Sequence, residues 1–194
     1  IVGDHGMSTI HTIFRPNLFI KDVPAKFTAA GGSAFLYRQP GATEDNSLII
    51  KKVVDQLNKL PKDKRKLFRI INRAELDKMG ADSTAIMALA AVPGIVFSGA
   101  TTASKTINQG PGTSIQQNPL QGIFVPTTGG HHGYDPNDPE MYTGFIASGA
   151  GINKGGRIKE LCVTDLAPLI AELLHFEFTC PDGKLPENIA NKLP

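Results

Sequence analysis

The pattern of apolar and polar residues along this 194-residue chain predicts strands that alternate with helices. Strict alternation indicates a half-buried strand, and a short apolar run between turn residues indicates a buried one. Strands are expected at STIHTIF (8–14), SAFLYR (33–38) and KLFRII (66–71), in two runs of 83–99 separated by Pro93-Gly94, at the start of 122–141, and in YTGFIASGAGI (142–152).

Three segments have the pattern of helices. In residues 45–60 the apolar positions fall mostly on one helical face. A second, short helix is expected after Asn72, a good N-cap, and it should stop at Gly80. A third should begin at Thr164 or Asp165, with a proline in its first turn, where the missing N–H does no harm.

Strands that alternate with helices are typical of an α/β domain, and the length suits one domain with an insert. We expect that insert, a smaller α/β unit, at about 23–121. Within it, 100–122 is rich in Gly, Thr, Ser, Gln and Asn and predicts a long loop.

Two glycine-flanked turns contain the candidate chemistry. Asp4 and His5 lie between Gly3 and Gly6, and a histidine pair, 131–132, follows glycines at the end of a predicted strand. In open α/β sheets, ligands gather where strands end. Adjacent residues of a strand point to opposite faces, so one ion could bind both Asp4 and His5 only if glycine lets the chain leave the strand.

Carboxylate and neutral imidazole suit zinc, at about 2.0–2.2 Å, and also manganese or iron. Taken alone, the Asp-His turn is more often an Asx-type turn with a surface imidazole, and GGHHGYD is as often an ordinary polar loop. Two such turns in one domain favour a metal site.

Charge and composition exclude only a few classes of function. A net charge of +2 gives no reason to expect binding to a nucleic-acid duplex, and no apolar stretch approaches the ~20 residues of a membrane span. Cys162 lies in an apolar segment and is expected to be a small buried hydrophobic residue. The two cysteines, Cys162 and Cys180, do not indicate whether the protein works in an oxidising or a reducing compartment.

The order of the motifs resembles one protein family. VGDHGM, then GHHGYD, FIASGAGI, TDLAPLIAELL and CPDGKLPENI are similar to the C-terminal part of the alkaline phosphatase superfamily, in its type I phosphodiesterase/nucleotide pyrophosphatase branch. The resemblance implies an alkaline-phosphatase-like three-layer α/β sheet. It runs from Ile1 to about Leu185, and it is loose over the insert.

The resemblance also implies site residues. Asp4 and His5 match ligands to one of two catalytic divalent ions, expected to be zinc, with manganese possible, and His132 matches a ligand to the other. His131 occupies a variable position and receives no role. Tyr134 and Asp135 match the pattern, and we expect them to hold the loop or to support the ligands.

The implied activity is two-metal hydrolysis of a phosphodiester or pyrophosphate, such as a nucleotide, by a Thr or Ser nucleophile. In the family, the nucleophile and the remaining ligands precede the Asp-His-Gly-Met turn. We therefore expect a longer natural chain upstream of Ile1 and no activity from this polypeptide alone. Self-association of a truncated sheet, which would cover its exposed edges, is a further hypothesis.

Alternatives stay open at this point. One is a non-catalytic metal- or ligand-binding domain, and others are a phosphomutase, a sulfatase or a phosphonate hydrolase of the same superfamily. Relatives are often exported, which favours a periplasmic or extracellular location.

Overall fold

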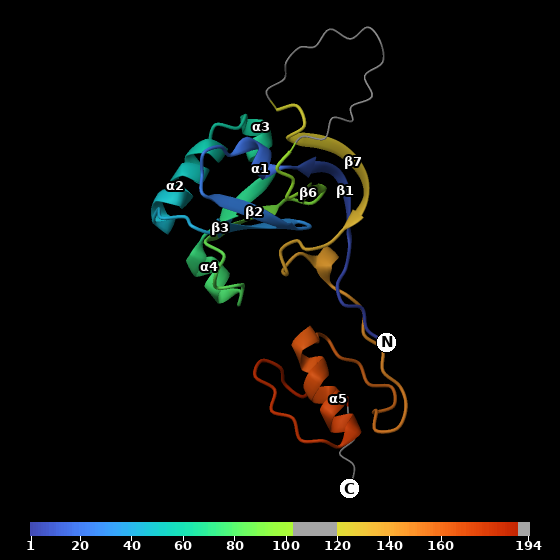
Figure 1. Ribbon diagram of the computed structural model, residues 1–194. Coiled ribbons are helices and arrows are strands. Elements are labelled where there is room, and N and C mark those ends of the chain that lie inside the picture. Colours follow the sequence, from blue (N-terminus) through green and yellow to red (C-terminus); the bar gives the residue numbers. More distant parts are fainter. Residues whose placement is uncertain (103–119, 190–194) are drawn as a thin grey trace. The chain divides into compact units, whose positions relative to one another are not determined.

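The computed structural model describes residues 1–102 and 120–189 (Figure 1). The chain divides into two compact units. The large unit is Gly6–Tyr142, and the small unit combines Ile1–His5 with Thr143–Pro194.

The large unit contains two sheets. The first has the order β6-β1-β7, with β1 (Ser8–Phe14) parallel to β6 (Ile95–Phe97) and antiparallel to β7 (Phe124–His131). The second is antiparallel throughout and has the order β2-β3-β5-β4, with bounds Ala25–Ala30, Ser33–Arg38, Met87–Ala91 and Phe68–Ile71.

Short helices complete the large unit. They are α1 (Pro16–Phe19), α2 (Asn46–Leu57), α3 (Lys62–Arg65), α4 (Arg73–Lys78) and the 3-10 turn η1 (Pro139–Met141). α2 and α4 cover opposite faces of the second sheet (Figure 1), since Ile49 and Val53 of α2 pack in one apolar cluster and Leu76 of α4 in another.

Local signals in the sequence placed most of these elements. The strand expected at 33–38 is β3, and α2 starts after Asp45, whose carboxylate accepts the N–H of Ser47 at 2.7 Å. α4 has the predicted cap, because Asn72 accepts the N–H of Glu75 at 2.9 Å, and Gly80 follows with φ +67°. A polar side chain at an N-cap replaces a missing helical bond partner.

A cluster of phenylalanines joins the two sheets. Phe14 of β1 is fully buried, and its ring stacks on Phe124 of β7 with centroids 4.4 Å apart. The same ring lies 5.3 Å from Phe68 of β4 and 5.7 Å from Phe97 of β6. Four strands from two sheets therefore meet at one aromatic side chain.

The small unit contains η2 (Val163–Asp165) and α5 (Leu166–Leu174). The strand expected at 142–152 is wrong. The described residues form only isolated bridges there, such as that of Phe145 with Val2, and Ile146 is 66% exposed. Its three glycines weaken a strand here, because glycine has no side chain to pack and loses more backbone freedom than other residues on folding.

Asp165 is the N-cap residue of α5, one of the two expected, but its carboxylate accepts the N–H groups of Cys162 (3.1 Å) and Lys184 (2.8 Å) rather than an N–H of the helix. One further expectation for the small unit needs correction. Cys162 is exposed, because it stands at the start of η2 rather than inside an apolar strand.

The second sheet and the helices between its strands lie within 25–91. The next strand, β6, pairs with β1 in the first sheet. Most of the loop expected at 100–122 lies outside the described residues. In the part of the chain that the structure describes, no helix is both long and apolar enough to cross a bilayer.

Candidate functional site

Asp4 and His5 form a pair at a bend of the small unit. The carboxylate of Asp4 accepts the backbone N–H of His5 at 3.0 Å through Oδ1. Its other oxygen, Oδ2, lies 3.4 Å from Nε2 of the His5 imidazole. The chain has left extended geometry here, as the flanking glycines allow, so both side chains point the same way.

This geometry fits a metal ion. Two ligand atoms bound to one tetrahedral zinc at about 2.0–2.2 Å lie about 3.4 Å apart. The Asp4 oxygen and the His5 nitrogen have that spacing, and the Asp4 side chain is 86% exposed, so an ion can reach it. The pair can therefore supply two ligands to one ion.

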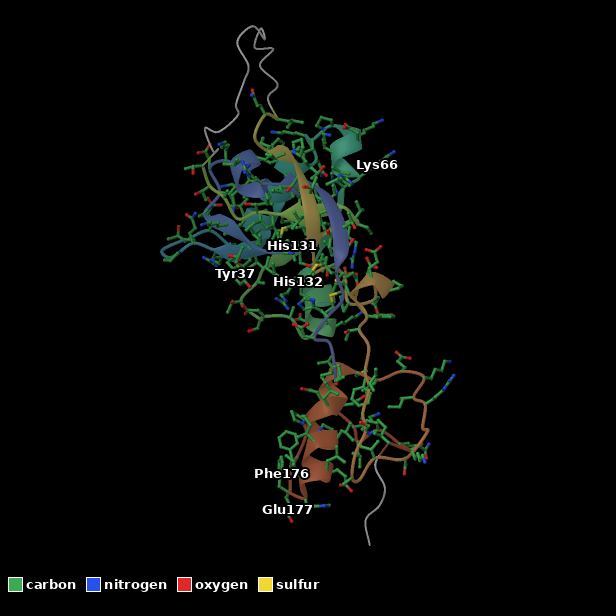
Figure 2. The ribbon with its side chains drawn as sticks, turned by 90° about the vertical axis from the view of Figure 1, so that its right-hand side faces the viewer. Tyr37, Lys66, His131, His132, Phe176 and Glu177 are labelled. Carbon is green, nitrogen blue, oxygen red and sulfur yellow. The ribbon has the colours of Figure 1, made fainter. Side chains whose placement is uncertain are left out.

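The second candidate region, which we call the His132 loop, comprises residues 132–138 and follows β7 in the large unit. The rings of His131 and His132 lie side by side, with centroids 5.2 Å apart (Figure 2). Nδ1 of His131 accepts the backbone N–H of His132 at 3.0 Å. One ring nitrogen of His131 therefore takes part in shaping the loop. The assignment of the metal to His132 stays a prediction.

The loop passes close to the turn between β2 and β3. The N–H of Gly32 donates to the carbonyl oxygen of His132 at 2.9 Å. Gly133 has φ +79°, and a Cβ there would overlap the carbonyl oxygen of Ala30. Only glycine combines this conformation with such an approach, which explains the glycine after His132.

Tyr134 anchors the loop from inside. It is 5% exposed, and its hydroxyl donates to the carbonyl oxygen of Ile95 at 2.8 Å. Burial, together with the carboxylates of Glu140 and Asp138, raises the pKa of Tyr134, so the hydroxyl stays a donor. The expected role in holding the loop agrees with this contact.

Tyr134→Phe removes that buried hydrogen bond while keeping the ring. The free energy of unfolding is expected to fall by about 0.5–1.5 kcal/mol, as for other buried hydrogen bonds. Denaturant unfolding of the variant measures the difference. Tyr142→Phe is the matched control, because Tyr142 is 64% exposed, and an equal effect of both variants would contradict the anchor.

Asp135, the residue after Tyr134, makes two further contacts that hold the loop. Its carboxylate accepts the N–H of Asn137 at 3.0 Å and the guanidinium of Arg69 at 2.8 Å. These two contacts lower the pKa of Asp135. The contacts therefore stabilise the fold above the ordinary carboxyl pKa of about 3.9, and this stabilisation is lost as the pH falls through the lowered pKa.

The contact of Arg69 with the His132 loop was not predicted from the sequence. Nothing in KLFRII distinguishes Arg69 from an ordinary exposed strand residue, and its partner Asp135 is 66 residues away.

The predicted ligands belong to different units: Asp4 and His5 to the small one, and His132 to the large one. Among residues 1–102 and 120–189, no three His, Cys, Asp or Glu side chains form a group that could hold a metal ion. That the three ligands serve one bimetallic centre stays a prediction.

Comparison with known proteins gives matches at the level of structure. No protein-family model and no curated protein sequence matches the chain. Human ectonucleotide pyrophosphatase/phosphodiesterase 5 is similar with a TM-score of 0.65 and 14% identity, over 97% of this chain and 44% of that one. The murine protein gives a TM-score of 0.63 and 16% identity with the same coverage, both alone and as an inactive variant in complex with AMP.

At this identity the likeness concerns the fold, and the expected fold class is confirmed. The chain spans less than half the length of these structures. The described chain has the alkaline-phosphatase-like α/β fold of part of an ectonucleotide pyrophosphatase/phosphodiesterase.

Proposed function

We propose that the protein containing this chain is a metal-dependent phosphoester hydrolase of the phosphodiesterase/nucleotide pyrophosphatase family. The observation that carries the proposal is the Asp4–His5 pair, whose oxygen and nitrogen are 3.4 Å apart, the spacing of two ligands on one zinc. The fold supports it, because structures that share this fold include those of a nucleotide pyrophosphatase/phosphodiesterase.

His132 is proposed to hold a second ion. Support comes from the resemblance of GHHGYD to the family's motif, in which His132 matches a ligand to the second ion. That Asp4, His5 and His132 serve one bimetallic centre is part of the proposal.

In this proposal each residue of the chain has a defined task. Asp4 and His5 hold one ion, His132 holds the other, and Tyr134 and Asp135 fix the loop that carries His132. The ions would neutralise the phosphoryl oxygens and lower the pKa of the attacking hydroxyl. That hydroxyl belongs to a Thr or Ser outside this chain, so the 194 residues alone should be inactive.

The proposed substrate is a small phosphodiester or pyrophosphate such as a nucleotide. The inactive variant of the murine protein was solved in complex with AMP. That complex concerns the murine protein, and it motivates the choice of substrate for this one.

A second candidate is a metal-binding domain without catalysis. It is favoured by the small number of matching ligands, since the described residues contain no cluster of three. Metal binding cannot distinguish the two candidates, because both bind metal. Hydrolysis of a substrate can, because only the first candidate is a hydrolase.

The test uses the complete protein and bis(p-nitrophenyl) phosphate. Removal of metal by a chelator is expected to lower hydrolysis more than about 100-fold, and zinc or manganese should restore it. Metal binding without hydrolysis would support the second candidate. Hydrolysis that survives complete metal removal would contradict both metal-based accounts.

A further inference from the structure

Three contacts connect the His132 loop with other elements of the large unit. The carbonyl oxygen of His132 accepts from Gly32, and Tyr134 donates to Ile95. The third contact is the ion pair between Asp135 and Arg69 at 2.8 Å. The first two involve the turn after β2 and the start of β6, and the third alone reaches β4.

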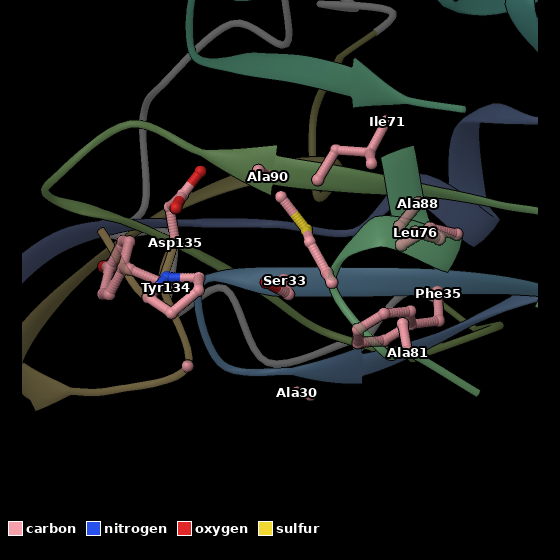
Figure 3. Close-up of a pocket in the computed structure, with 13 residues that line it drawn as sticks. Ala30, Ser33, Phe35, Ile71, Leu76, Ala81, Ala88, Ala90, Tyr134 and Asp135 are labelled. Atoms are coloured by element: carbon pink, nitrogen blue, oxygen red, sulfur yellow. The ribbon is translucent and has the colours of Figure 1, made fainter. Parts of the chain in front are cut away.

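A pocket of about 290 Å³ separates the loop from α4 (Figure 3). Tyr134 and Asp135 lie on one side of it and Leu76 of α4 on the other, above the sheet residues Ser33 and Ala90. Atoms beside a hollow lack packing partners on that side. Apolar packing therefore fixes the loop less firmly here, and polar contacts across the pocket gain importance.

Arg69 is placed to bridge this gap. It stands opposite Ala90 in the β4–β5 ladder and two residues before Ile71, so it shares the sheet face that lines the pocket. Its Nη1 binds Glu75 in the first turn of α4, and its Nη2 binds Asp135 of the loop. A planar guanidinium can hold two carboxylates in fixed directions, which an ammonium cannot.

We propose that Arg69 is a positioning residue for His132, acting through a clamp formed by Arg69, Glu75 and Asp135. The inference rests on the proposed function, in which His132 holds a metal ion. Metal binding demands a ligand held within about 0.5 Å, and loss of a residue that supports a ligand costs about 10–100-fold in affinity.

A plain surface ion pair is the competing explanation. The Arg69 side chain is 46% exposed, and exposed pairs add little to stability. The two explanations differ in what they predict. A surface pair has no effect on metal affinity, whereas the clamp lowers metal affinity when it is broken, even where the stability of the metal-free protein is unchanged.

The experiment compares Arg69→Gln with Arg38→Gln in the complete protein. Arg38 is an exposed arginine of β3 that contacts Asn46 and Ala42, away from the loop. Cobalt(II) replaces zinc and reports the ligand geometry through its visible spectrum. Arg69→Gln should weaken cobalt binding about 10–100-fold and alter the spectrum, with unfolding of the metal-free protein similar to that of Arg38→Gln.

Further variants test whether Arg69 acts on His132 through Asp135. Asp135→Asn should have the effect of Arg69→Gln, and the double variant should be little worse than either, since both remove the Arg69–Asp135 ion pair. Arg69→Lys should restore affinity only in part. Unchanged cobalt affinity in Arg69→Gln, or a loss that merely follows a loss of stability, would overturn the clamp.

His132→Asn separates this inference from the proposed function. If it leaves cobalt binding unchanged, the proposed metal site fails and the clamp fails with it. If it weakens binding whereas Arg69→Gln does not, only the clamp is wrong.

Discussion

Replacing Asp4 with Asn in the complete protein is expected to lower phosphodiester hydrolysis at least about 100-fold, more than the loss of a residue that merely supports a ligand. Asn keeps the size of Asp but lacks the charge that holds a divalent ion. The Asp4 oxygen that lies 3.4 Å from the His5 nitrogen would become part of a neutral amide. Measurement of kcat/KM together with the zinc content of the protein reports both activity and occupancy.

Asp63→Asn is the control for this change. Asp63 is also an exposed aspartate beside a basic residue, with Lys64 at 3.3 Å, but it lies on α3 and has no proposed role. Its variant should keep wild-type activity and zinc content. Equal activities of the two variants would exclude Asp4 as a metal ligand.

The largest expected effect on stability comes from Phe14→Ala. The ring is fully buried and contacts phenylalanines of β4, β6 and β7, so its removal leaves a cavity where the two sheets meet. Large-to-small changes of this kind cost about 3–5 kcal/mol, out of a total stability of about 5–15 kcal/mol. Urea unfolding followed by circular dichroism measures the difference.

Phe176→Ala is the matched variant, because that ring is 50% exposed. Its effect should stay within about 0.5 kcal/mol. A loss below about 1 kcal/mol for Phe14→Ala would mean that the two sheets do not depend on this aromatic cluster.

Elements with strong local signals could be predicted from the sequence. β3 alternates inward and outward residues between turn residues, and α2 and α4 have polar caps at Asp45 and Asn72 that satisfy their first N–H groups. These features act within a few residues, so no knowledge of distant partners is needed.

Features that depend on distant partners could not be predicted. The strand expected at 142–152 required a neighbour along its whole length, whereas the pairing with residues 1–3 in the described residues reaches only 144–146. The clamp needs Arg69 and Asp135, which are 66 residues apart, and the pattern around each gives no sign of the other. The Asp4–His5 pair was predictable because adjacent residues between glycines can turn their side chains the same way.

The most direct test of the account is a crystal structure of the complete protein, grown with zinc and measured at the zinc absorption edge. The account predicts one anomalous peak within about 2.0–2.2 Å of both the Asp4 carboxylate and the His5 imidazole, and a second beside the His132 imidazole. Zinc bound elsewhere, with these three side chains facing unrelated surfaces, would contradict it.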